Sequence, residues 1–324
     1  MTLQEDYRAL REGAALATGA DRGRIGVSGR DRASWLQGLL TNDIQALTPG
    51  TGCYAAWLTP QGRMTTDMHV LESGDTILLD VPGAQREPLL QRLEQFLFSE
   101  DVQIGDLTGA LAAVAVHGPR SAETVEAATG LHGLAEWPAY RNVRAESGVV
   151  ARIDQLGVPG YTLYVDDAGE ADVAAALERA GARRIAADAL EIARVEAGYP
   201  LFGTDMDDDI IPLEAGIEER AISLSKGCYV GQEVIIRVLH RGHGRVVRRL
   251  VGLRMAGGAP PARGARSHAG GRDAGFVTSA AASPRLGAIA LGYVHRDFVA
   301  PGTAVEIGAD AGRAAATVSA LPFA

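Results

Sequence analysis

Cysteine is scarce in this sequence, which holds only Cys53 and Cys228 among 324 residues. Two cysteines exclude a disulfide framework and favour a reducing compartment. No apolar run approaches the ~20 residues that cross a bilayer. The acidic start MTLQEDYRALREGAAL also lacks the cationic and apolar segments of a signal peptide. We therefore expect a soluble cytoplasmic protein.

Several chemical signatures are also missing. The sequence has no phosphate-binding P-loop, no G-x-S-x-G and no C-x-x-C, which argues against a P-loop nucleotide hydrolase, a serine hydrolase and a dithiol redox protein. The net charge of −9 and the pI near 5.3 disfavour nucleic acid and anionic membranes as partners.

One basic segment departs from that average. It could hold a polyanionic tail, phosphates or RNA, although a solvated loop is the simpler interpretation. Its two histidines have no third ligand nearby, so we expect no metal site. The segment comprises Arg237, His240, Arg241, His243, Arg245, Arg248 and Arg249.

The pattern of apolar residues predicts an α+β fold of two or three domains. Strands are expected at GRIGVSG, CYAAWLT, MTTDMHVLE and TILLDV, with Gly74-Asp75 as a tight turn before the last. AQREPLLQRLEQFLF has the spacing of an amphipathic helix. From about Arg245 onward, short apolar runs separated by Gly or Pro predict a small β-barrel.

Cys228 is the first candidate for chemistry. It lies in KGCYVGQE, two residues after Lys226, and a cationic neighbour lowers the pKa of a thiol. Spacing alone favours the alternative, a small buried hydrophobic residue. Cys53, inside the apolar run CYAAWL, is expected in the core.

Asp67 is the second candidate. In RMTTDMHV, strand alternation places Met64, Met68 and Val70 near one face and Thr65, Asp67 and His69 on the other. A carboxylate on a sheet face can line a pocket and bind a ligand nitrogen, but a solvated sheet face is the more common reason for this pattern.

Glu196 is the third candidate. It lies in DALEIARVEAGYP, where Asp188 and Glu191 suggest a capping box and Gly198 a helix end. The helical spacing brings Glu196 to the buried flank, where an acid is paired or holds a polar ligand. A structural salt bridge with Arg194 is an equally good explanation.

The motifs resemble one family over nearly the whole chain. KGCYVGQE is similar to the signature of the YgfZ family, folate-binding relatives of the glycine-cleavage T-protein, an aminomethyltransferase. WLQGLLTNDI and PGTGCYAAWLTPQGRMTTDMHV resemble the N-terminal part of both proteins. RVEAGYPLFGTDMDDDIIPLEAG resembles their central motif, and SPRLGAIALGYVHRDFVAPGTAVEI resembles their closing barrel.

The resemblance implies a three-domain ring around a channel for tetrahydrofolate or a one-carbon derivative. Its mixed α/β folate-binding region would span 1–236, with 51–139 inserted between 1–50 and 140–236, and a C-terminal β-barrel would span 237–324. Glu196 matches the family glutamate that contacts the pterin, Arg194 precedes it in the same motif, and Asp67 falls near the aspartate that serves the T-protein in catalysis. The T-protein has two adjacent aspartates there, whereas this chain has Thr66-Asp67.

The resemblance also changes the interpretation of the cysteine motif, because YgfZ proteins keep the cysteine and the T-protein lacks it. Cys228 and Lys226 are then predicted to be catalytic. The surrounding residues Tyr229, Gln232 and Glu233 are predicted to contribute to the folate site.

Three functions follow as hypotheses. The main one is a folate-binding accessory protein for assembly or repair of iron–sulfur enzymes, with an indirect link to tRNA modification and those enzymes or their assembly factors as partners. The second is an aminomethyltransferase that uses tetrahydrofolate and a lipoyl carrier. The third is an RNA-binding module, which the net charge disfavours, and no membrane partner is expected.

Overall fold

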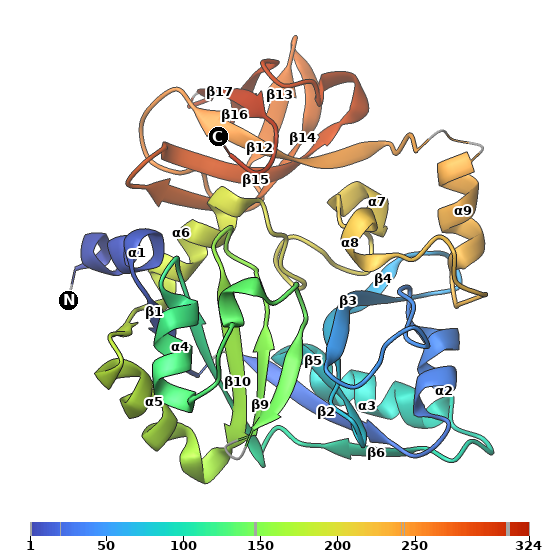
Figure 1. The fold of residues 1–324 in the computed structure, drawn as a ribbon. Coiled ribbons are helices and arrows are strands. Elements are labelled where there is room, and N and C mark those ends of the chain that lie inside the picture. Colours follow the sequence, from blue (N-terminus) through green and yellow to red (C-terminus); the bar gives the residue numbers. More distant parts are fainter. Residues whose placement is uncertain are drawn as a thin grey trace.

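The protein is described by a computed structural model that covers residues 2–19, 21–145, 148–240, 242, 244–308 and 312–323. Its strands form two open sheets and one closed barrel. The two sheets lie side by side, and the barrel lies across one end of the pair (Figure 1).

The first sheet has five antiparallel strands in the order β3-β4-β5-β2-β6. The chain turns between β3 and β4 at Gly62, which has a φ of +75°, and between β4 and β5 at Gly74, which has a φ of +105°. These turns confirm the predicted hairpin. The strands are β2 (Arg22–Ser28), β3 (Thr51–Leu58), β4 (Met64–Glu72), β5 (Thr76–Pro82) and β6 (Gln103–Asp106).

The second sheet has six strands in the order β11-β1-β7-β10-β9-β8, and only the short β1–β11 pair is parallel. Its strands are β1 (Ala15–Ala17), β7 (Leu111–His117), β8 (Asn142–Ala145), β9 (Gly148–Arg152), β10 (Gly160–Asp166) and β11 (Arg183–Arg184). The predicted insertion of 51–139 stays a prediction about domain limits. The strands of the five-stranded sheet all lie within 22–106.

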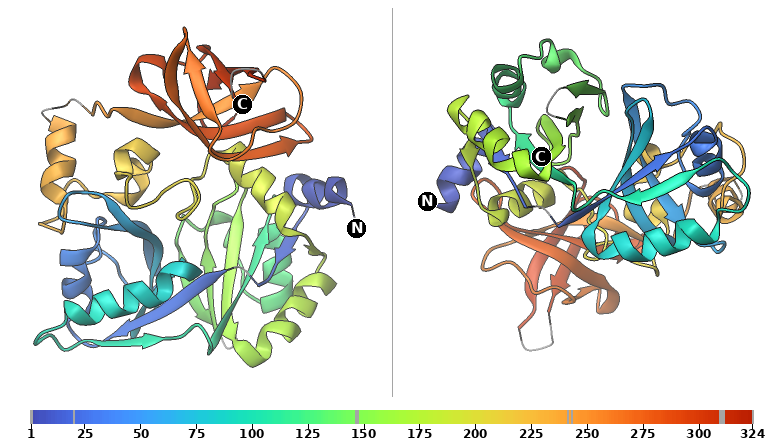
Figure 2. Two further views of the ribbon diagram at one scale, coloured as in Figure 1. Left: turned by 180° about the vertical axis from the view of Figure 1, so that it is seen from behind. Right: turned by 90° about the horizontal axis from the view of Figure 1, so that it is seen from below.

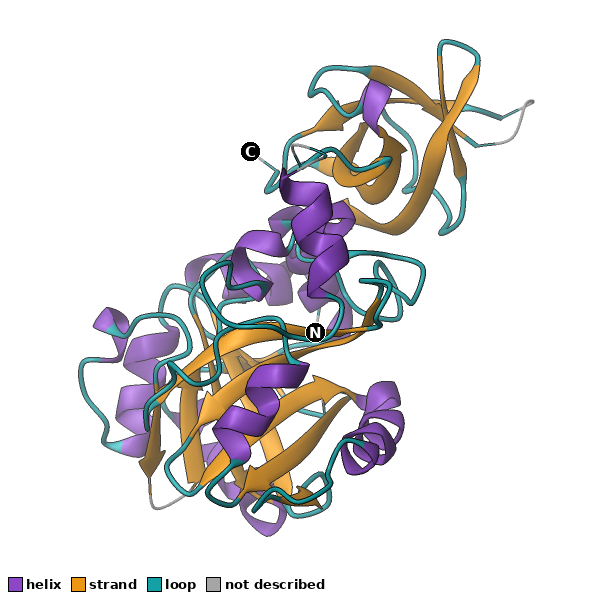
Figure 3. Cartoon of the chain, turned by 90° about the vertical axis from the view of Figure 1, so that its right-hand side faces the viewer, coloured by secondary structure: helices purple, strands orange, loops and turns teal. Residues whose placement is uncertain are grey.

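The third unit is a closed barrel in the order β12-β15-β14-β13-β16-β17. Its interior is filled by small and branched apolar side chains such as Leu253, Val277 and Val294. The strands are β12 (Arg248–Met255), β13 (Arg266–Ala269), β14 (Arg272–Ser283), β15 (Gly287–His295), β16 (Ala304–Ile307) and β17 (Ala314–Ser319). Figure 3 shows the barrel set apart from the sheets, with helices between them.

Helices cover the outer faces of both sheets (Figure 2). Trp35 and Leu36 of α2 and Leu89 and Leu93 of α3 share one core with the five-stranded sheet. The nine α-helices in the described part of the chain are α1 (Leu3–Glu12), α2 (Arg32–Leu39), α3 (Arg86–Gln95), α4 (Ser121–Thr129), α5 (Glu170–Arg179), α6 (Ala187–Ala197), α7 (Pro212–Ala215), α8 (Glu218–Ala221) and α9 (Gln232–His240).

The sheets contact each other through a small apolar cluster that includes Leu71 and Leu78 from one sheet and Ala151 and Tyr164 from the other. A larger cluster joins α6, α7, the five-stranded sheet and the barrel. Because the sheet faces and the barrel converge, polar side chains from distant parts of the sequence can meet between them.

The expected fold class, α+β with a C-terminal barrel, is confirmed. Helix α6 ends at Gly198 as predicted, with a φ of +69°. The predicted Asp188–Glu191 capping box is wrong, because α6 follows Ala186 without a side-chain cap and Glu191 binds Arg194 instead. None of the helices in the described ranges is long and apolar enough to span a membrane.

Candidate active site

A narrow cavity of about 70 Å³ lies where the two sheets meet the segment that follows α6. Strands β2, β3 and β4 each contribute side chains, and the other lining residues come from loops near Tyr140 and Gln155, from α6 and the loop after it, and from α8. Its lining consists of Arg22, Tyr54, Asp67, His69, Tyr140, Gln155, Leu156, Arg194, Tyr199, Pro200, Leu201 and Arg220.

Asp67 is the buried carboxylate of this cavity, with 7% of its surface exposed. The Tyr54 hydroxyl donates a hydrogen bond of 2.6 Å to Asp67 Oδ2. Asp67 Oδ1 is buried and has no hydrogen-bond partner among the described residues. Burial raises the pKa of Asp67, and Arg22 and the Tyr54 hydrogen bond only partly oppose that rise. The site thus holds an acceptor oxygen that a ligand N–H could satisfy.

Strand alternation explains this placement. Asp67 and His69 share one face of β4, and Tyr54 on β3 lies directly opposite His69. Met68 and Val70 point into the core behind the sheet, as predicted. Met64 does not join them: it belongs to the central cluster, because a register shift between Trp57 and Leu58 interrupts the alternation.

His69 lines the cavity and is uncharged at neutral pH. Burial and the charge of Arg22 lower its pKa to about 3. The amide nitrogen of Gln155 is bonded to His69 Nε2, and His69 Nδ1 lies 3.2 Å from the Tyr140 hydroxyl. With the amide as donor, Nε2 accepts, so Nδ1 carries the proton and donates to Tyr140.

Arg22 and Asp80 form a buried ion pair beneath the cavity. Arg22 Nε donates to Asp80 Oδ1 at 2.6 Å, and the Tyr164 hydroxyl donates to Asp80 Oδ2 at 2.5 Å. Burial opposes the charge of both partners, but their attraction prevails, so the pKa of Asp80 is lowered and that of Arg22 is raised. Asp80 is therefore held ionised while Asp67 is pushed toward protonation.

Arg220 lines the cavity and packs against two aromatic rings. Its guanidinium lies 4.3 Å from the ring centroid of Tyr199 and 5.2 Å from that of Tyr54. No carboxylate among the described residues lies within ion-pair distance of it. It acts on Asp67 through space, as one of the charges that oppose the rise of the Asp67 pKa.

Arg194 lines the cavity as predicted, but its donors are used structurally. Its guanidinium binds Asp205 at 2.6 Å, Glu191 at 2.6 Å and the Ser279 hydroxyl at 2.7 Å. These bonds tie α6 to β14 of the barrel and to the loop that carries Tyr199, whose carbonyl also accepts from Arg194 at 2.6 Å.

Glu196 is not among the described residues that line the cavity. Its carboxylate accepts from the Tyr7 hydroxyl at 2.8 Å and is also bonded to Arg11 and to Ser283. The buried acid is therefore ion-paired with Arg11 of α1 and, at 3.9 Å, with Arg285, and not with Arg194. Its predicted contact with a pterin stays a prediction, and this network uses both of its oxygens.

Lys226, the only lysine of the sequence, supports a helix end. Its side chain is buried, with 8% exposed, and its ammonium donates to the carbonyls of Gln37, Leu40 and Asn42 at 2.6, 2.6 and 2.9 Å. These carbonyls lie at the C-terminal end of α2. Burial lowers the pKa of Lys226 to about 8, which leaves it mostly charged at pH 7.

The rest of the cysteine motif lies outside the cavity as well. Cys228 is exposed. Tyr229 packs in the central cluster, Gln232 begins α9, and Glu233 forms an exposed pair with Arg237 at 2.6 Å. Their predicted roles in catalysis and folate binding stay untested, and no described residue of this motif lines the cavity with Asp67.

The second glycine of that motif, Gly231, has a structural reason. Its φ is +84°, and a Cβ at this position would lie 2.5 Å from the carbonyl oxygen of Thr59. The motif therefore packs tightly on the β3–β4 turn. Cys53, the other cysteine, is half-buried on β3, and burial raises its pKa to about 12.

The basic segment divides between several environments. Arg248 binds Glu214 at 3.3 Å, and Arg249 binds Glu218 at 2.7 Å. Arg241 and His243 lie outside the described residues. In the parts of the chain that are described, no group of three or more metal-binding side chains is present.

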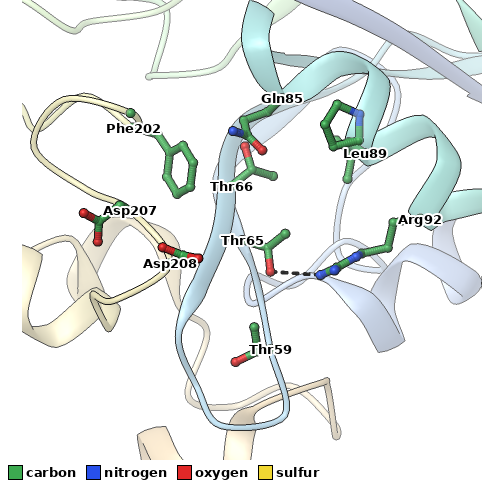
Figure 4. Close-up of a pocket in the computed structure, with 11 residues that line it drawn as sticks. Thr59, Thr65, Thr66, Gln85, Leu89, Arg92, Phe202, Asp207 and Asp208 are labelled. Atoms are coloured by element: carbon green, nitrogen blue, oxygen red, sulfur yellow. Dashed lines mark hydrogen bonds between the residues drawn. The ribbon is translucent and has the colours of Figure 1, made fainter.

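A second pocket, of about 510 Å³, lies on the other side of β4. It is wider but open, and Arg92 donates to the Thr65 hydroxyl at 3.2 Å within it (Figure 4). The exposed Asp207 and Asp208 lie at its edge. Its described lining shares no residue with the cavity at Asp67 and includes no buried carboxylate.

Sequence reasoning missed most of the cavity wall. Strand alternation gave a usable signal for His69 and, through its cross-strand partner, for Tyr54. Tyr199 follows the predicted helix end at Gly198 directly. Arg22 and Arg220 come from distant segments, and nothing local marks them as neighbours of Asp67.

Comparison with known proteins places this geometry in a family. Residues 1–226 match the GCVT N-terminal domain, and residues 248–324 match the glycine cleavage T-protein C-terminal barrel domain. The aminomethyltransferase of Geobacillus kaustophilus (strain HTA426) is 30% identical over 332 residues, which cover 99% of this chain and 90% of the relative. That of Rubrobacter xylanophilus is 31% identical over 296 residues, covering 90% and 79%.

A solved structure supports the same fold. Glycine cleavage system aminomethyltransferase T from Bartonella henselae superposes with a TM-score of 0.90 at 22% identity, covering 99% of this chain and 89% of that one.

These findings correct the main functional hypothesis. The predicted iron–sulfur accessory role, with its link to tRNA modification, is contradicted, because the relatives are named aminomethyltransferases. They agree better with the second hypothesis. With both halves of the sequence matched, the chain belongs to the glycine-cleavage T-protein family of aminomethyltransferase-like proteins.

Proposed function

We propose that this protein is a tetrahydrofolate-dependent aminomethyltransferase whose substrate folate binds in the cavity at Asp67. The observation that carries the proposal is Asp67 Oδ1, a buried carboxylate oxygen of a cavity-lining residue, with no hydrogen-bond partner among the described residues. The names of the relatives supply the reaction class.

The donor set suits a reduced folate. A pteridine ring carries N–H donors and flat apolar faces, and the cavity offers a free carboxylate oxygen beside the rings of Tyr54, Tyr140 and Tyr199. Tyr54 holds the other oxygen of Asp67, so the free one has a fixed direction. A ligand N–H at Oδ1 would remove an unsatisfied buried acceptor.

The cavity must widen to admit such a ring. Its volume of about 70 Å³ is well below the roughly 300 Å³ at which ligand pockets begin. Arg220 is the side chain best able to leave, because it is half-buried and is held there by contacts with two aromatic rings. Arg22 and Arg194, by contrast, are fixed by short ion pairs.

Asp67 is the group that would handle a proton. When bound, tetrahydrofolate supplies an amine nitrogen that takes up the transferred carbon. Because burial raises its pKa, the Asp67 carboxylate is a stronger proton acceptor than an ordinary aspartate. Arg22 and Arg220 limit that rise, so they keep Asp67 available as an acceptor.

Thr66 does not weaken this assignment. The T-protein pattern has a second aspartate at this position, but successive strand residues point to opposite faces. Thr66 lies opposite Trp57 and lines the open pocket of Figure 4, whereas Asp67 lies opposite Ala56 and lines the cavity. The substitution therefore leaves the cavity's own carboxylate in place.

The direct test is turnover. The protein is mixed with tetrahydrofolate and an aminomethyl-lipoyl carrier protein, and the release of ammonia and of methylene-tetrahydrofolate is followed. We expect both products in equal amounts, dependent on folate. Binding of folate without release of ammonia would reject the transferase activity, and no binding of folate would also reject the site.

A further inference from the structure

The side chain of Asn42 joins strand β3 to helix α8. Because β3 is the edge strand of its sheet, one side of its backbone needs partners from elsewhere. The Asn42 amide nitrogen donates to the carbonyl of Tyr54 on β3 at 2.8 Å and to the carbonyl of Arg220 on α8 at 3.0 Å. Its oxygen accepts from the backbone N–H of Asp43 at 2.9 Å. Both amide N–H donors are therefore used, each on a different segment.

Thr41 makes a second link beside the first. Its hydroxyl donates to the carbonyl of Ala221 at 2.6 Å and accepts from the backbone N–H of Ala56 at 2.9 Å. Thr41 is fully buried, and Ala56 lies directly opposite Asp67 in the β3–β4 register. Thr41 and Asn42 therefore tie the part of β3 that adjoins Asp67 to the last two residues of α8.

Helix α8 depends on these links for its place. It has only four residues, Glu218–Ala221, and a helix of about one turn is not stable by itself. The Arg220 guanidinium has no ion-pair partner among the described residues and packs on the rings of Tyr54 and Tyr199. The place of this charge is therefore set by where the backbone of α8 is held.

We propose that Asn42 is a positioning residue for Asp67, and that it acts by fixing the backbone of Arg220 to that of Tyr54. Both of these residues line the cavity with Asp67, and the Tyr54 hydroxyl donates to Asp67 Oδ2 at 2.6 Å. Asn42 is not among the described residues that line the cavity, so it acts through these two neighbours. The inference rests on the proposed function, because it takes Asp67 to be the reacting carboxylate.

The charge of Arg220 influences Asp67 directly. Burial raises the pKa of Asp67, and the charges of Arg22 and Arg220 oppose that rise. Arg22 is fixed by its ion pair with Asp80, so Arg220 is the charge that a shift of α8 would move. The charged and titratable side chains that line the cavity with Asp67 are Arg22 of β2, Tyr54 of β3, His69 of β4, Arg194 of α6, Arg220 of α8, and Tyr140 and Tyr199 from loops.

Lys226 holds the Asn42 turn from another direction. Its ammonium donates to the carbonyl of Asn42 at 2.9 Å and to the carbonyls of Gln37 and Leu40 before it. The cysteine motif is thereby joined to the cavity through this turn, although no described residue of the motif lines the cavity. The positioning role of Asn42 thus gives the lysine of that motif an indirect connection to Asp67.

The titration of Asp67 tests the inference without folate. The signal of its carboxyl carbon is followed by NMR as the pH is varied, and D67N identifies that signal. In N42L, which has a side chain of similar size without donors, we expect the pKa of Asp67 to rise by about half a pH unit, the size of a weak ion pair. R220Q should raise it similarly. N42L/R220Q should add nothing to R220Q, because Asn42 acts through Arg220.

Y161F is the matched control. The Tyr161 hydroxyl donates to the carbonyl of Leu134 at 2.6 Å, and Tyr161 is fully buried and is not among the described residues that line the cavity. Like N42L, this variant removes a side-chain donor from a backbone carbonyl, so both should lower the urea midpoint. Only N42L should change the titration of Asp67.

Turnover provides a second measurement. With tetrahydrofolate and an aminomethyl-lipoyl carrier, kcat/KM of N42L should fall by about 10- to 100-fold, as expected when a group of the site is displaced. In Y161F, it should stay at the wild-type value.

Each other result has a definite meaning. An unchanged titration of Asp67 in folded N42L overturns the positioning role, whatever the turnover. Additive shifts in N42L/R220Q overturn the action through Arg220. A shifted titration together with no turnover by the wild type rejects the proposed function and leaves the placement of Arg220 by Asn42 standing. If N42L does not fold, N42S, which keeps one shorter donor, takes its place and should shift the titration in the same direction.

Discussion

Replacing Asp67 with asparagine isolates the charge of the carboxylate from its shape. The amide is nearly the same size, and its oxygen can still accept from the Tyr54 hydroxyl, which now donates at 2.6 Å. What changes is the other oxygen, Oδ1, which is buried without a partner. The substitution therefore alters the ligand side of the group and spares the fold.

Two magnitudes follow from this geometry. A hydrogen bond to a charged acceptor contributes about 1.5–3 kcal/mol, so D67N should weaken tetrahydrofolate binding by about tenfold to about a hundredfold. Turnover should fall further, since a positioned proton acceptor contributes about 10²- to 10⁴-fold.

The same substitution should not lower the free energy of unfolding. The folded-state pKa of Asp67 is raised, so its ionised form lowers stability above that pKa, and the penalty disappears as the pH falls below the unfolded value. Because D67N removes the charge, the variant should be at least as stable as the wild type at pH 7.

The assay combines calorimetric titration of tetrahydrofolate with urea unfolding at pH 7. D188N, at an exposed aspartate in the first turn of α6, serves as the matched control. It should change neither the affinity for tetrahydrofolate nor the urea midpoint. Wild-type affinity and turnover in D67N would refute the reasoning. A marked loss of stability would show that the carboxylate is structural and not poised for a ligand.

Two further predictions concern stability. Burial lowers the pKa of His69 to about 3 and that of His117 to about 4, so between those values and about 6.5 the unfolded chain binds more protons and stability falls as the pH falls. From pH 7 to pH 5 we expect the free energy of unfolding to fall by about 2 kcal/mol per histidine, which the urea midpoint measures. H117N should make this dependence on pH less steep. H132N, at an exposed site, should leave it unchanged. K226M should lower the urea midpoint by the equivalent of about 1–3 kcal/mol or more, because it leaves three carbonyls at the end of α2 without their donor. An unchanged midpoint would contradict that structural role.

The fold followed from sequence where the signal was local. Strand alternation, the Gly74 turn and the Gly198 helix end depend on a few neighbouring residues, and the structure has them where they were expected. Local rules failed where tertiary contacts compete. Glu191 binds Arg194 and so does not cap α6, and a register shift turns Met64 away from Met68.

The site was harder to predict because it is assembled from distant segments. Asp67 could be singled out by its place on a strand, but its partners Arg22, Tyr199 and Arg220 meet it only after the sheets and barrel pack together. Glu196 shows the converse. A buried acid near a motif suggested a ligand, yet its oxygens are satisfied by Tyr7, Arg11 and Ser283 from other elements.

The cysteine motif has a similar explanation. Lys226 stands two residues from Cys228 and suggested activation of the thiol, but its ammonium points to the end of α2 and donates to three carbonyls there. Sequence distance says which residues are near along the chain, but not which way a side chain points.

A crystal structure of the protein with tetrahydrofolate bound would test the folate site most directly. We expect the ring in the cavity between the two sheets, with one of its N–H groups donating to Asp67 Oδ1 and with Arg220 displaced from its place between Tyr54 and Tyr199. Folate bound instead in the open pocket beside Thr65 and Arg92, with Asp67 Oδ1 still unpaired, would contradict the assignment.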